Sequence, residues 1–304
     1  MEYIIDSSFH EVRLDRFLRK KYENTPLTEI FKGIRTGKIK VNGKKSKENY
    51  RLKEGDIVKV LIAGGETVAK DFIKILPQDM NTIKSGIVYE DEKVVIFNKE
   101  ANLVMHKGSG HEYGLSELFK SYYKTDEFNF VNRIDKSTSG LVIGAKSLAV
   151  TRELAEEVRE GKTDKKYYIL VDGIITKKEF TLKTYLKKEE TKVIELDSYE
   201  DGAKESISYF KVLKIGKRKT ILEGKLETGR THQLRVQLSN LGHPIVGDGK
   251  YGKGGKNMFL FSYYCEIPKY KIKIELPLPE EFLKNLDQKN GFYFKPFFLL
   301  LLFI

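Results

Sequence analysis

Three short segments of this 304-residue chain hold the residues that could do chemistry. In the first, VNRIDKSTSGLVIGAK (131–146), Asp135 stands close to a fixed cation, Arg133, and ahead of a Ser-Thr-Ser-Gly turn that leads into an apolar run. A carboxylate in this setting can act as a nucleophile or as a general base. An Asp in a turn more often caps its own backbone, so this segment alone leaves both interpretations open.

The second segment, DKKYYILVDG (164–173), has the pattern of a strand, in which successive side chains point to opposite faces. One of Tyr167 and Tyr168 can therefore face a cleft while the other packs. The alternative is that both rings only pack in the fold, with their hydroxyl groups at the surface.

The third segment is LETGRTHQLRVQLSNLGHPIVGDGKYG (226–252). It places Arg230 in a turn before a helix expected over 231–241, with Thr231 as the N-cap residue and Gly242 at the other end. The start of a helix adds positive potential for an anion. His232 and His243 have no third or fourth ligand at suitable spacing, so we expect no metal.

The elements that must position these residues follow from local patterns. Apolar runs predict strands at 94–97, 141–145, 167–171, 206–213 and 220–226. A helix is predicted over 147–160, with Ser147 as its N-cap and Gly161 just past its end. Helices and strands do not alternate strictly, so we expect an α+β fold around a mostly antiparallel sheet.

Composition limits the kind of partner. The chain has 55 Lys and Arg against 43 Asp and Glu, a formal net charge of +12, and 40% of its residues are hydrophobic. This balance excludes a disordered acidic chain and favours a folded protein with an anionic partner. The single cysteine, Cys265, excludes a disulfide framework and is interpreted as a packed thiol in a reducing compartment.

Half of the net charge lies in residues 1–62, which hold 15 Lys and Arg and 9 Asp and Glu. Helices are predicted over 13–21 and 27–35, and short strands over 38–41 and 57–61. Such a basic helix pair is either a solvated surface or a surface for RNA.

The stretches RLDRFL and IRTGKIKVNGKKSKENYRLKEGDIVKV resemble the S4-type RNA-binding domain, a small α/β unit. The resemblance implies that residues 1–62 form this domain. A Gly pair and mixed polarity over 63–85 predict a linker after it. It also implies that basic side chains hold structured RNA by its phosphates. The candidates are Arg13, Arg16, Arg19, Lys20, Lys38, Lys44 and Lys45.

Together the three chemical segments resemble the RluA-type pseudouridine synthases, most closely the RluC-like and RluD-like members that carry an N-terminal S4-type domain. The similarity rests on RIDKSTSG, KKYYILVDG, TGRTHQLRV, GHPIVGD, KYG and LPLPEEF. It implies a pseudouridine synthase fold over 86–285, with a mixed, mostly antiparallel sheet, flanking helices and a central cleft. Asp135 would be the catalytic aspartate, Tyr167 the active-site tyrosine, Arg230 the arginine paired with the aspartate, and Arg133 an RNA contact. No cofactor or metal is implied.

Three positions depart from the family pattern. Asn132 stands where the family usually has His, Gln237 replaces the His of its R-V-H, and KEANL (99–103) replaces its K-P-x-G-L. We expect the catalytic trio to be retained and the 99–103 loop near the cleft to be altered.

The function expected from this resemblance is isomerisation of specific uridines to pseudouridine in ribosomal RNA, with the large-subunit RNA as target. The alternatives are a non-catalytic RNA-binding ribosome-assembly factor on the same fold and a synthase acting on transfer RNA. We expect a cytoplasmic monomer, because no targeting signal is visible at the start.

The end of the chain, 286–304, is unusually apolar. Its uninterrupted apolar run, 297–304, is eight residues long, against the roughly 20 that a membrane helix needs, so we expect no membrane contact. A packed terminal strand and a segment foreign to the fold are the two favoured alternatives, and a membrane tail is the third.

Overall fold

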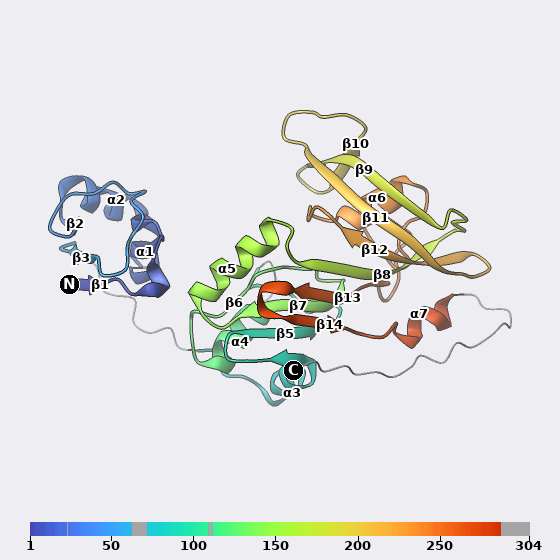
Figure 1. The fold of residues 1–304 in the computed structure, drawn as a ribbon, viewed down its shortest axis with the longest axis horizontal. Helices are drawn as coiled ribbons and strands as arrows, with labels where there is room; N and C mark the ends of the chain where they lie inside the picture. The colour runs from blue at the N-terminus through green and yellow to red at the C-terminus, as the bar shows by residue number, and fades with distance from the viewer. Residues whose placement is uncertain (23, 63–71, 109, 111, 287–304) are drawn as a thin grey trace.

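The computed structural model describes residues 1–22, 24–62, 72–108, 110 and 112–286. A small N-terminal domain precedes a larger domain that is built on one sheet (Figure 1). The apolar tail at 286–304 lies outside the described residues except for Leu286, which is buried.

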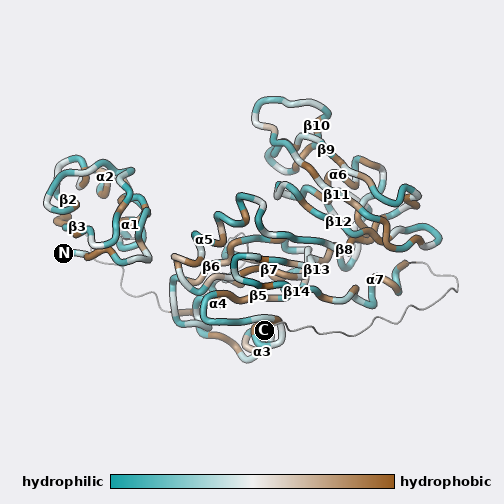
Figure 2. Tube along the Cα trace, viewed as in Figure 1, coloured by the Kyte–Doolittle hydropathy of each residue, from teal (hydrophilic) through white to brown (hydrophobic). Residues whose placement is uncertain are grey.

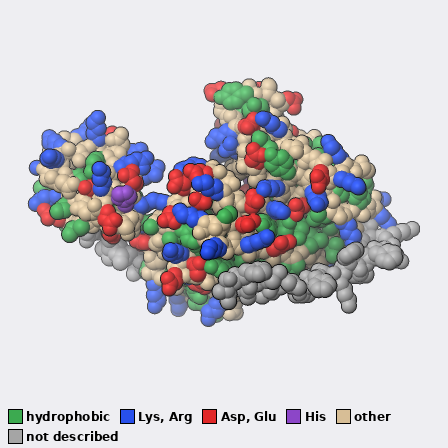
Figure 3. Space-filling model, in the orientation of Figure 1, with side chains coloured by type: hydrophobic (Ala, Val, Ile, Leu, Met, Phe, Trp, Pro, Cys, Tyr) green, Lys and Arg blue, Asp and Glu red, His purple; other side chains and the backbone are tan. Residues whose placement is uncertain are grey.

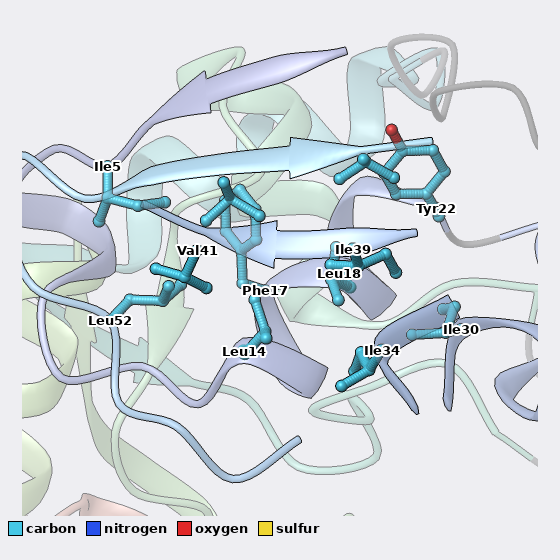
Figure 4. Close-up of a cluster of buried hydrophobic side chains, with 12 residues drawn as sticks. Ile5, Leu14, Phe17, Leu18, Tyr22, Ile30, Ile34, Ile39, Val41 and Leu52 are labelled. Atoms are coloured by element: carbon cyan, nitrogen blue, oxygen red, sulfur yellow. The ribbon is translucent and has the colours of Figure 1, made fainter. Parts of the chain in front are cut away.

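The N-terminal domain is a three-stranded antiparallel sheet with two helices. In sheet order its strands are β1 (Glu2–Ile4), β3 (Ile57–Val60) and β2 (Ile39–Val41), and its helices are α1 (Leu14–Lys21) and α2 (Leu27–Thr36). Leu14, Phe17 and Leu18 form an apolar stripe on α1, and they pack against buried side chains of α2 and the strands (Figure 4). Gly37 takes a φ of 74° and ends α2. The predicted helix pair and small sheet are confirmed.

The larger domain contains an eleven-stranded mixed sheet. Its main path runs β10 (Val193–Leu196), β9 (Glu179–Lys188), β11 (Lys204–Ile215), β12 (Lys219–Leu226), β8 (Asp164–Asp172), β13 (Leu260–Ile267), β7 (Ser139–Ala145), β5 (Val94–Lys99) and β4 (Ile87–Glu90). Strand β14 (Ile272–Glu275) pairs with β13, and β6 (Asn129–Phe130) pairs with β7. Only β7 and β13 are parallel among the described strands. The predicted α+β class with a mostly antiparallel sheet is confirmed.

Helices flank the sheet on the faces that its alternating apolar residues bury. On the half around β7, α3 (Pro77–Gly86) and α4 (Leu115–Tyr123) share a core with Val142, and α5 (Leu148–Arg159) shares another with the neighbouring Leu141 and Ile143. On the other half, α6 (Gln233–Asn240) packs Leu234 and Leu238 against β8 and β12. Figure 2 shows the apolar segments concentrated in this interior. No helix in the described part of the chain is long and apolar enough to cross a bilayer.

Two local predictions of the α5 region hold. Ser147 is the N-cap of α5, and its side chain accepts a hydrogen bond from the backbone N–H of Val150. Gly161, with a φ of 69°, follows the end of the helix.

Cys265 lies in the core beside α5 with 1% of its surface exposed, and burial raises the pKa of its thiol to about 12. It is the packed thiol that the sequence predicted.

The prediction of a linker over 63–85 is wrong for its second half. Pro77 starts α3, and Ile83 on this helix is completely buried. Ile73 and Ile75 pack on the same core as Ile83. The larger domain therefore begins before residue 86, because these three isoleucines of an otherwise polar stretch pack in its core.

The two domains touch where the short 3-10 helix η1 (Ser7–Phe9) meets α5. Arg152 of α5 donates hydrogen bonds to the carbonyl oxygens of His10, at 2.6 Å, and of Ser8. α7 (Glu280–Asn285) ends the described chain and buries Phe282 against the larger domain.

Candidate active site

A cavity of about 240 Å³ opens beside the junction of β7, β8 and β13. Asp135, from the turn before β7, lines this cavity together with Tyr167 of β8 and Arg230 from the turn before α6. Arg133 lines it as well. The fold thus brings together residues from all three segments that the sequence singled out.

The turn that carries Asp135 is fixed by its own backbone and by a close approach of two strands. The Thr138 N–H donates to the Asp135 carbonyl at 3.0 Å. Two residues later Gly140 has a φ of 109°, and a Cβ there would lie only 2.2 Å from the Ser262 carbonyl oxygen of β13. Only glycine fits this point, because the parallel pairing of β7 with β13 begins here.

The arginine that pairs with Asp135 is Arg235. Its Nη1 donates to Asp135 Oδ2 at 2.8 Å, and its side chain is only 8% exposed. The prediction that Arg230 makes this pair is wrong, because Arg230 is exposed and its Nε donates to the Glu205 carbonyl at 3.0 Å. Arg235 instead lies on the first turn of α6 and points into the domain.

The start of α6 explains this difference. The helix begins at Gln233, and its N-cap is His232 in a left-handed conformation (φ 56°), so the prediction of Thr231 as N-cap is wrong. The Gln233 side-chain oxygen accepts from the Arg230 N–H at 3.0 Å and from the Thr228 hydroxyl at 2.9 Å. This side chain organises the turn in place of a capping hydroxyl and leaves Arg230 at the surface.

Asp248 holds the other edge of the Arg235 guanidinium. Its carboxylate, which is fully buried, accepts from Arg235 Nε at 2.7 Å and from Nη2 at 2.8 Å. Burial alone would raise the pKa of Asp248, but the hydrogen bonds from Arg235 and from the Lys250 and Tyr251 amides outweigh it and lower this pKa. Burial likewise opposes the charge of Arg235, and its two carboxylate partners raise its pKa above the usual value. The guanidinium is therefore a permanent, rigidly held cation.

His232 is a second neighbour of Asp135. Its Nε2 lies 3.6 Å from Asp135 Oδ2, and its Nδ1 lies 2.8 Å from the Tyr251 hydroxyl. Burial lowers the pKa of His232 more strongly than the Asp135 charge raises it. Among the described residues, Asp135 Oδ1 has no hydrogen-bond partner, so one carboxylate oxygen is held and the other is available to a reactant.

Tyr167 and Tyr168 face opposite sides of β8, as strand alternation predicts. Tyr167 is 7% exposed and lines the cavity, whereas Tyr168 stacks on Tyr263 with ring centroids 3.7 Å apart. Burial raises the pKa of Tyr167 to about 12, and the Asp135 charge acts in the same direction. Tyr167 is therefore a neutral phenol at neutral pH.

Comparison with known proteins gives the family. Residues 93–240 match the family model of RNA pseudouridylate synthases, and residues 12–58 match the S4 domain. The ribosomal large subunit pseudouridine synthase C of Buchnera aphidicola subsp. Baizongia pistaciae is 36% identical over 252 residues, which cover 82% of this chain and 79% of that protein. This chain belongs to the RNA pseudouridine synthase family.

Two further members support the assignment. The uncharacterized RNA pseudouridine synthase YlyB of Bacillus subtilis is 30% identical over 298 residues, which cover 92% of this chain and 95% of that protein. The solved structure of human RNA pseudouridylate synthase domain containing 1 has a TM-score of 0.57 and 28% identity, and it covers 66% of this chain and 86% of its own. The predicted pseudouridine synthase fold and S4 domain of the enzyme are confirmed.

In the altered 99–103 loop of this synthase, Asn102 stands at the position of the family's glycine. Asn102 has a φ of 70°, the left-handed conformation for which glycine is usual and asparagine is the next choice. The Asn102 N–H donates to the Lys136 carbonyl at 2.7 Å, next to Asp135. The loss of the family's glycine is therefore compensated locally.

The first residue of this loop, Lys99, also holds the Asp135 turn. It is 1% exposed, and its Nζ donates to the carbonyl oxygens of Glu100, Leu103 and Lys136 at 2.9, 3.0 and 3.1 Å. Burial lowers the pKa of Lys99 to about 8, although the charge of Asp135 opposes this shift. One ammonium group thus ties the end of β5 to the turn that carries Asp135.

We expect the kcat/KM of the enzyme to fall as pH rises through about 8, where Lys99 loses its proton. A neutral amine has two N–H donors for three carbonyl acceptors, so the turn that carries Asp135 loosens. Tritium release from RNA labelled at C5 of uridine, measured from pH 6.5 to 9.5, tests this. A Lys99→Arg variant keeps its charge and should lack the alkaline decline, and a flat wild-type profile would contradict the prediction.

The other two departures make hydrogen bonds within the fold, and Asn132 also lines the cavity. Asn132 Oδ1 accepts from the Ile143 N–H at 2.7 Å. Gln237 is buried and accepts from the Ser208 hydroxyl at 2.7 Å, while its amide donates to Thr184 Oγ1 at 3.0 Å. Gln237 does not line the cavity.

The predicted RNA-binding cations fall into two groups. Five are exposed, and their side chains make no ion pair or hydrogen bond with a described residue: Arg16, Arg19, Lys38, Lys44 and Lys45. Arg133, at the cavity, is also exposed, and its side chain likewise makes no ion pair or hydrogen bond with a described residue. Figure 3 shows Lys and Arg side chains distributed around the N-terminal domain.

Arg13 and Lys20 are engaged within the protein. Arg13 donates to both oxygens of Asp15, at 3.0 and 2.9 Å. Lys20 is half-buried, and it lies close enough to Glu127 and Asp126 of the larger domain for their charges to raise its pKa, although burial lowers it overall. Arg13 therefore pairs within the N-terminal domain, and Lys20 lies at the contact between the two domains.

Proposed function

We propose that this synthase isomerises specific uridines to pseudouridine in ribosomal RNA of the large subunit. The proposal rests on one arrangement: a carboxylate with one oxygen held and one free, beside a buried tyrosine, in a protein whose S4 domain also presents exposed, unpaired cations such as Arg16 and Arg19. The name of the Buchnera relative, a ribosomal large subunit pseudouridine synthase, supports this choice of RNA.

Asp135 is the proposed catalytic residue. Isomerisation breaks the bond between N1 and C1′, rotates the freed uracil, and forms a bond between C5 and C1′. The C5 proton leaves and N1 gains a proton, so atoms and electrons balance without a cofactor. Attack of Oδ1 on C1′, attack on C6 and abstraction of the 2′ proton all require the ionised carboxylate that Arg235 orients.

Tyr167 is proposed to stack on the uracil and to keep the detached ring in the cavity. Its position on the cavity wall and its buried ring fit this role. The raised pKa of Tyr167 weighs against its hydroxyl as the base that removes the C5 proton, because the phenol stays protonated at neutral pH.

The target base must leave its helix, which costs a few kcal/mol. We propose that Arg133 at the cavity and the unpaired cations of the S4 domain offset this cost by binding phosphates of the RNA. Arg230, which also lines the cavity, joins this group rather than the Asp135 pair. The enzyme is further proposed to act as a cytoplasmic monomer, since one chain supplies all of these residues.

Mapping of pseudouridines by carbodiimide-dependent stops of reverse transcription tests the function. Large-subunit RNA from a strain that lacks the gene should lose one or more stops, and the wild-type gene should restore them while Asp135→Asn should not. Loss of stops only in transfer RNA would instead identify a transfer RNA synthase. Unchanged stops together with a defect in ribosome assembly that Asp135→Asn rescues would identify an assembly factor.

A further inference from the structure

Lys165 is a cation of the cavity that the proposed chemistry does not use. It lies on β8 two residues before Tyr167, so both side chains are on the same face of the strand, and both line the cavity. Alternate residues on a strand are separated by about 7 Å. This is comparable to the separation between a base and the phosphate of the same nucleotide.

The ammonium group of Lys165 has no charged partner within the ranges that the structure describes. The side chain is half-buried, and it makes no ion pair or hydrogen bond with any residue in the described part of the chain. Burial lowers the pKa of Lys165, and among the described residues the one titratable group that opposes this shift is the Cys265 thiol, which lies opposite Lys165 on β13. Asp135 is already matched by Arg235, at 2.8 Å.

Even a half-buried cation without a partner loses part of its hydration, and such groups are usually paired in a folded protein. The cost is recovered when an anionic ligand brings the missing partner into the cavity. The neighbouring Lys166 shows the contrast, since it points to the opposite face and lies 3.8 Å from Glu223. Of these two lysines, Lys165 faces the cavity and has no carboxylate partner among the described residues.

We propose that Lys165 binds a phosphate of the nucleotide whose uracil stacks on Tyr167. This inference rests on the proposed function, and it adds a substrate contact inside the cavity that is separate from the cations of the S4 domain. Lys165 thereby recognises the target uridine as part of a phosphodiester chain.

The test compares Lys165→Met, which keeps the aliphatic stem, with Lys166→Met as the matched control. Tritium release is measured on a transcript of large-subunit ribosomal RNA labelled at C5 of uridine, over a range of KCl concentrations. For Lys165→Met we expect KM to rise about 10- to 100-fold with kcat within threefold of wild type. The plot of log(kcat/KM) against log[KCl] should become shallower by about 0.7, the value for one lost contact to a single strand.

Lys166→Met should match the wild type in KM, kcat and the slope against salt concentration. Lys165→Arg should bring KM most of the way back to the wild-type value. If Lys165→Met does not fold, as judged by circular dichroism, Lys165→Gln replaces it. An unchanged KM and salt slope in the neutral variant would overturn the inference, and so would an equal loss in Lys166→Met. A wild-type protein that releases no tritium from this RNA would overturn the proposed function instead, which keeps the two failures distinct.

Discussion

Replacing Asp135 with Asn should lower the rate of tritium release by at least about 10⁴-fold, the scale seen when an essential catalytic group is removed. The amide has nearly the same volume as the carboxylate, and its oxygen can still accept the hydrogen bond from Arg235. It cannot act as the nucleophile or as the base, so the chemical step is lost while the site keeps its shape. The measurement is single-turnover tritium release with enzyme in excess over RNA.

Binding separates this result from misfolding. The affinity of Asp135→Asn for the same RNA should stay within about threefold of wild type, since the substitution leaves the proposed phosphate contacts of Arg133 and the S4 domain unaffected. Asp172→Asn is the matched control, because Asp172 is a partly exposed carboxylate at the end of β8 that does not line the cavity. Release above about one tenth of the wild-type rate in Asp135→Asn would refute its catalytic role.

The elements nearest the chemistry could be predicted because their signals are local. A buried run of branched residues gave β7, and the pair Ser147 and Gly161 marked both ends of α5. Strands β9 and β13 are absent from the predictions although each carries a local signal: β9 alternates polar and apolar residues, and β13 is a buried run rich in aromatic residues. Local patterns do not show which strands pair, and β13 pairs with β7 and β8, which are distant from it in the sequence. Such pairing depends on tertiary contacts, which local patterns do not contain.

The choice between Arg230 and Arg235 shows the same limit inside the site. Both arginines stand in the motif TGRTHQLRV, and sequence spacing placed Arg230 at the helix start. Which arginine pairs with Asp135 depends on Gln233. Its side chain accepts a hydrogen bond from the Arg230 N–H in the turn, and the helix begins at Gln233, after His232. Asp248 offered a usable signal, because a carboxylate in GHPIVGD has to be matched by a cation when it is buried.

The second large effect is expected for Arg235→Met, which should lower the free energy of unfolding by about 3–5 kcal/mol. Asp248 would be left fully buried with only two backbone amides to satisfy its charge. Activity should fall as well, because Asp135 loses the group that orients it. Urea denaturation measures the first effect and tritium release the second. Arg230→Met is the control, and it should change stability by less than about 0.5 kcal/mol because Arg230 is exposed.

The destabilisation should depend on pH in a direction set by Asp248. In the wild type the pKa of Asp248 is lowered, so its contribution to stability is present above the unfolded value of about 3.9 and is lost as pH falls further. In Arg235→Met the unpaired buried carboxylate should have a raised pKa, so the variant should gain stability as pH falls towards about 4. The two proteins should therefore differ most near pH 7 and converge in acid.

A second substitution separates the two roles of Arg235. Adding Asp248→Leu to Arg235→Met removes the uncompensated charge, and replacing a buried ion pair by apolar residues is often neutral or stabilising. We expect the double variant to recover most of the lost stability but none of the lost activity, because Asp135 still lacks its guanidinium partner. If the double variant were as unstable as Arg235→Met, the isolated charge of Asp248 would not be the cause. If it regained activity, the pair between Arg235 and Asp135 would be dispensable for catalysis.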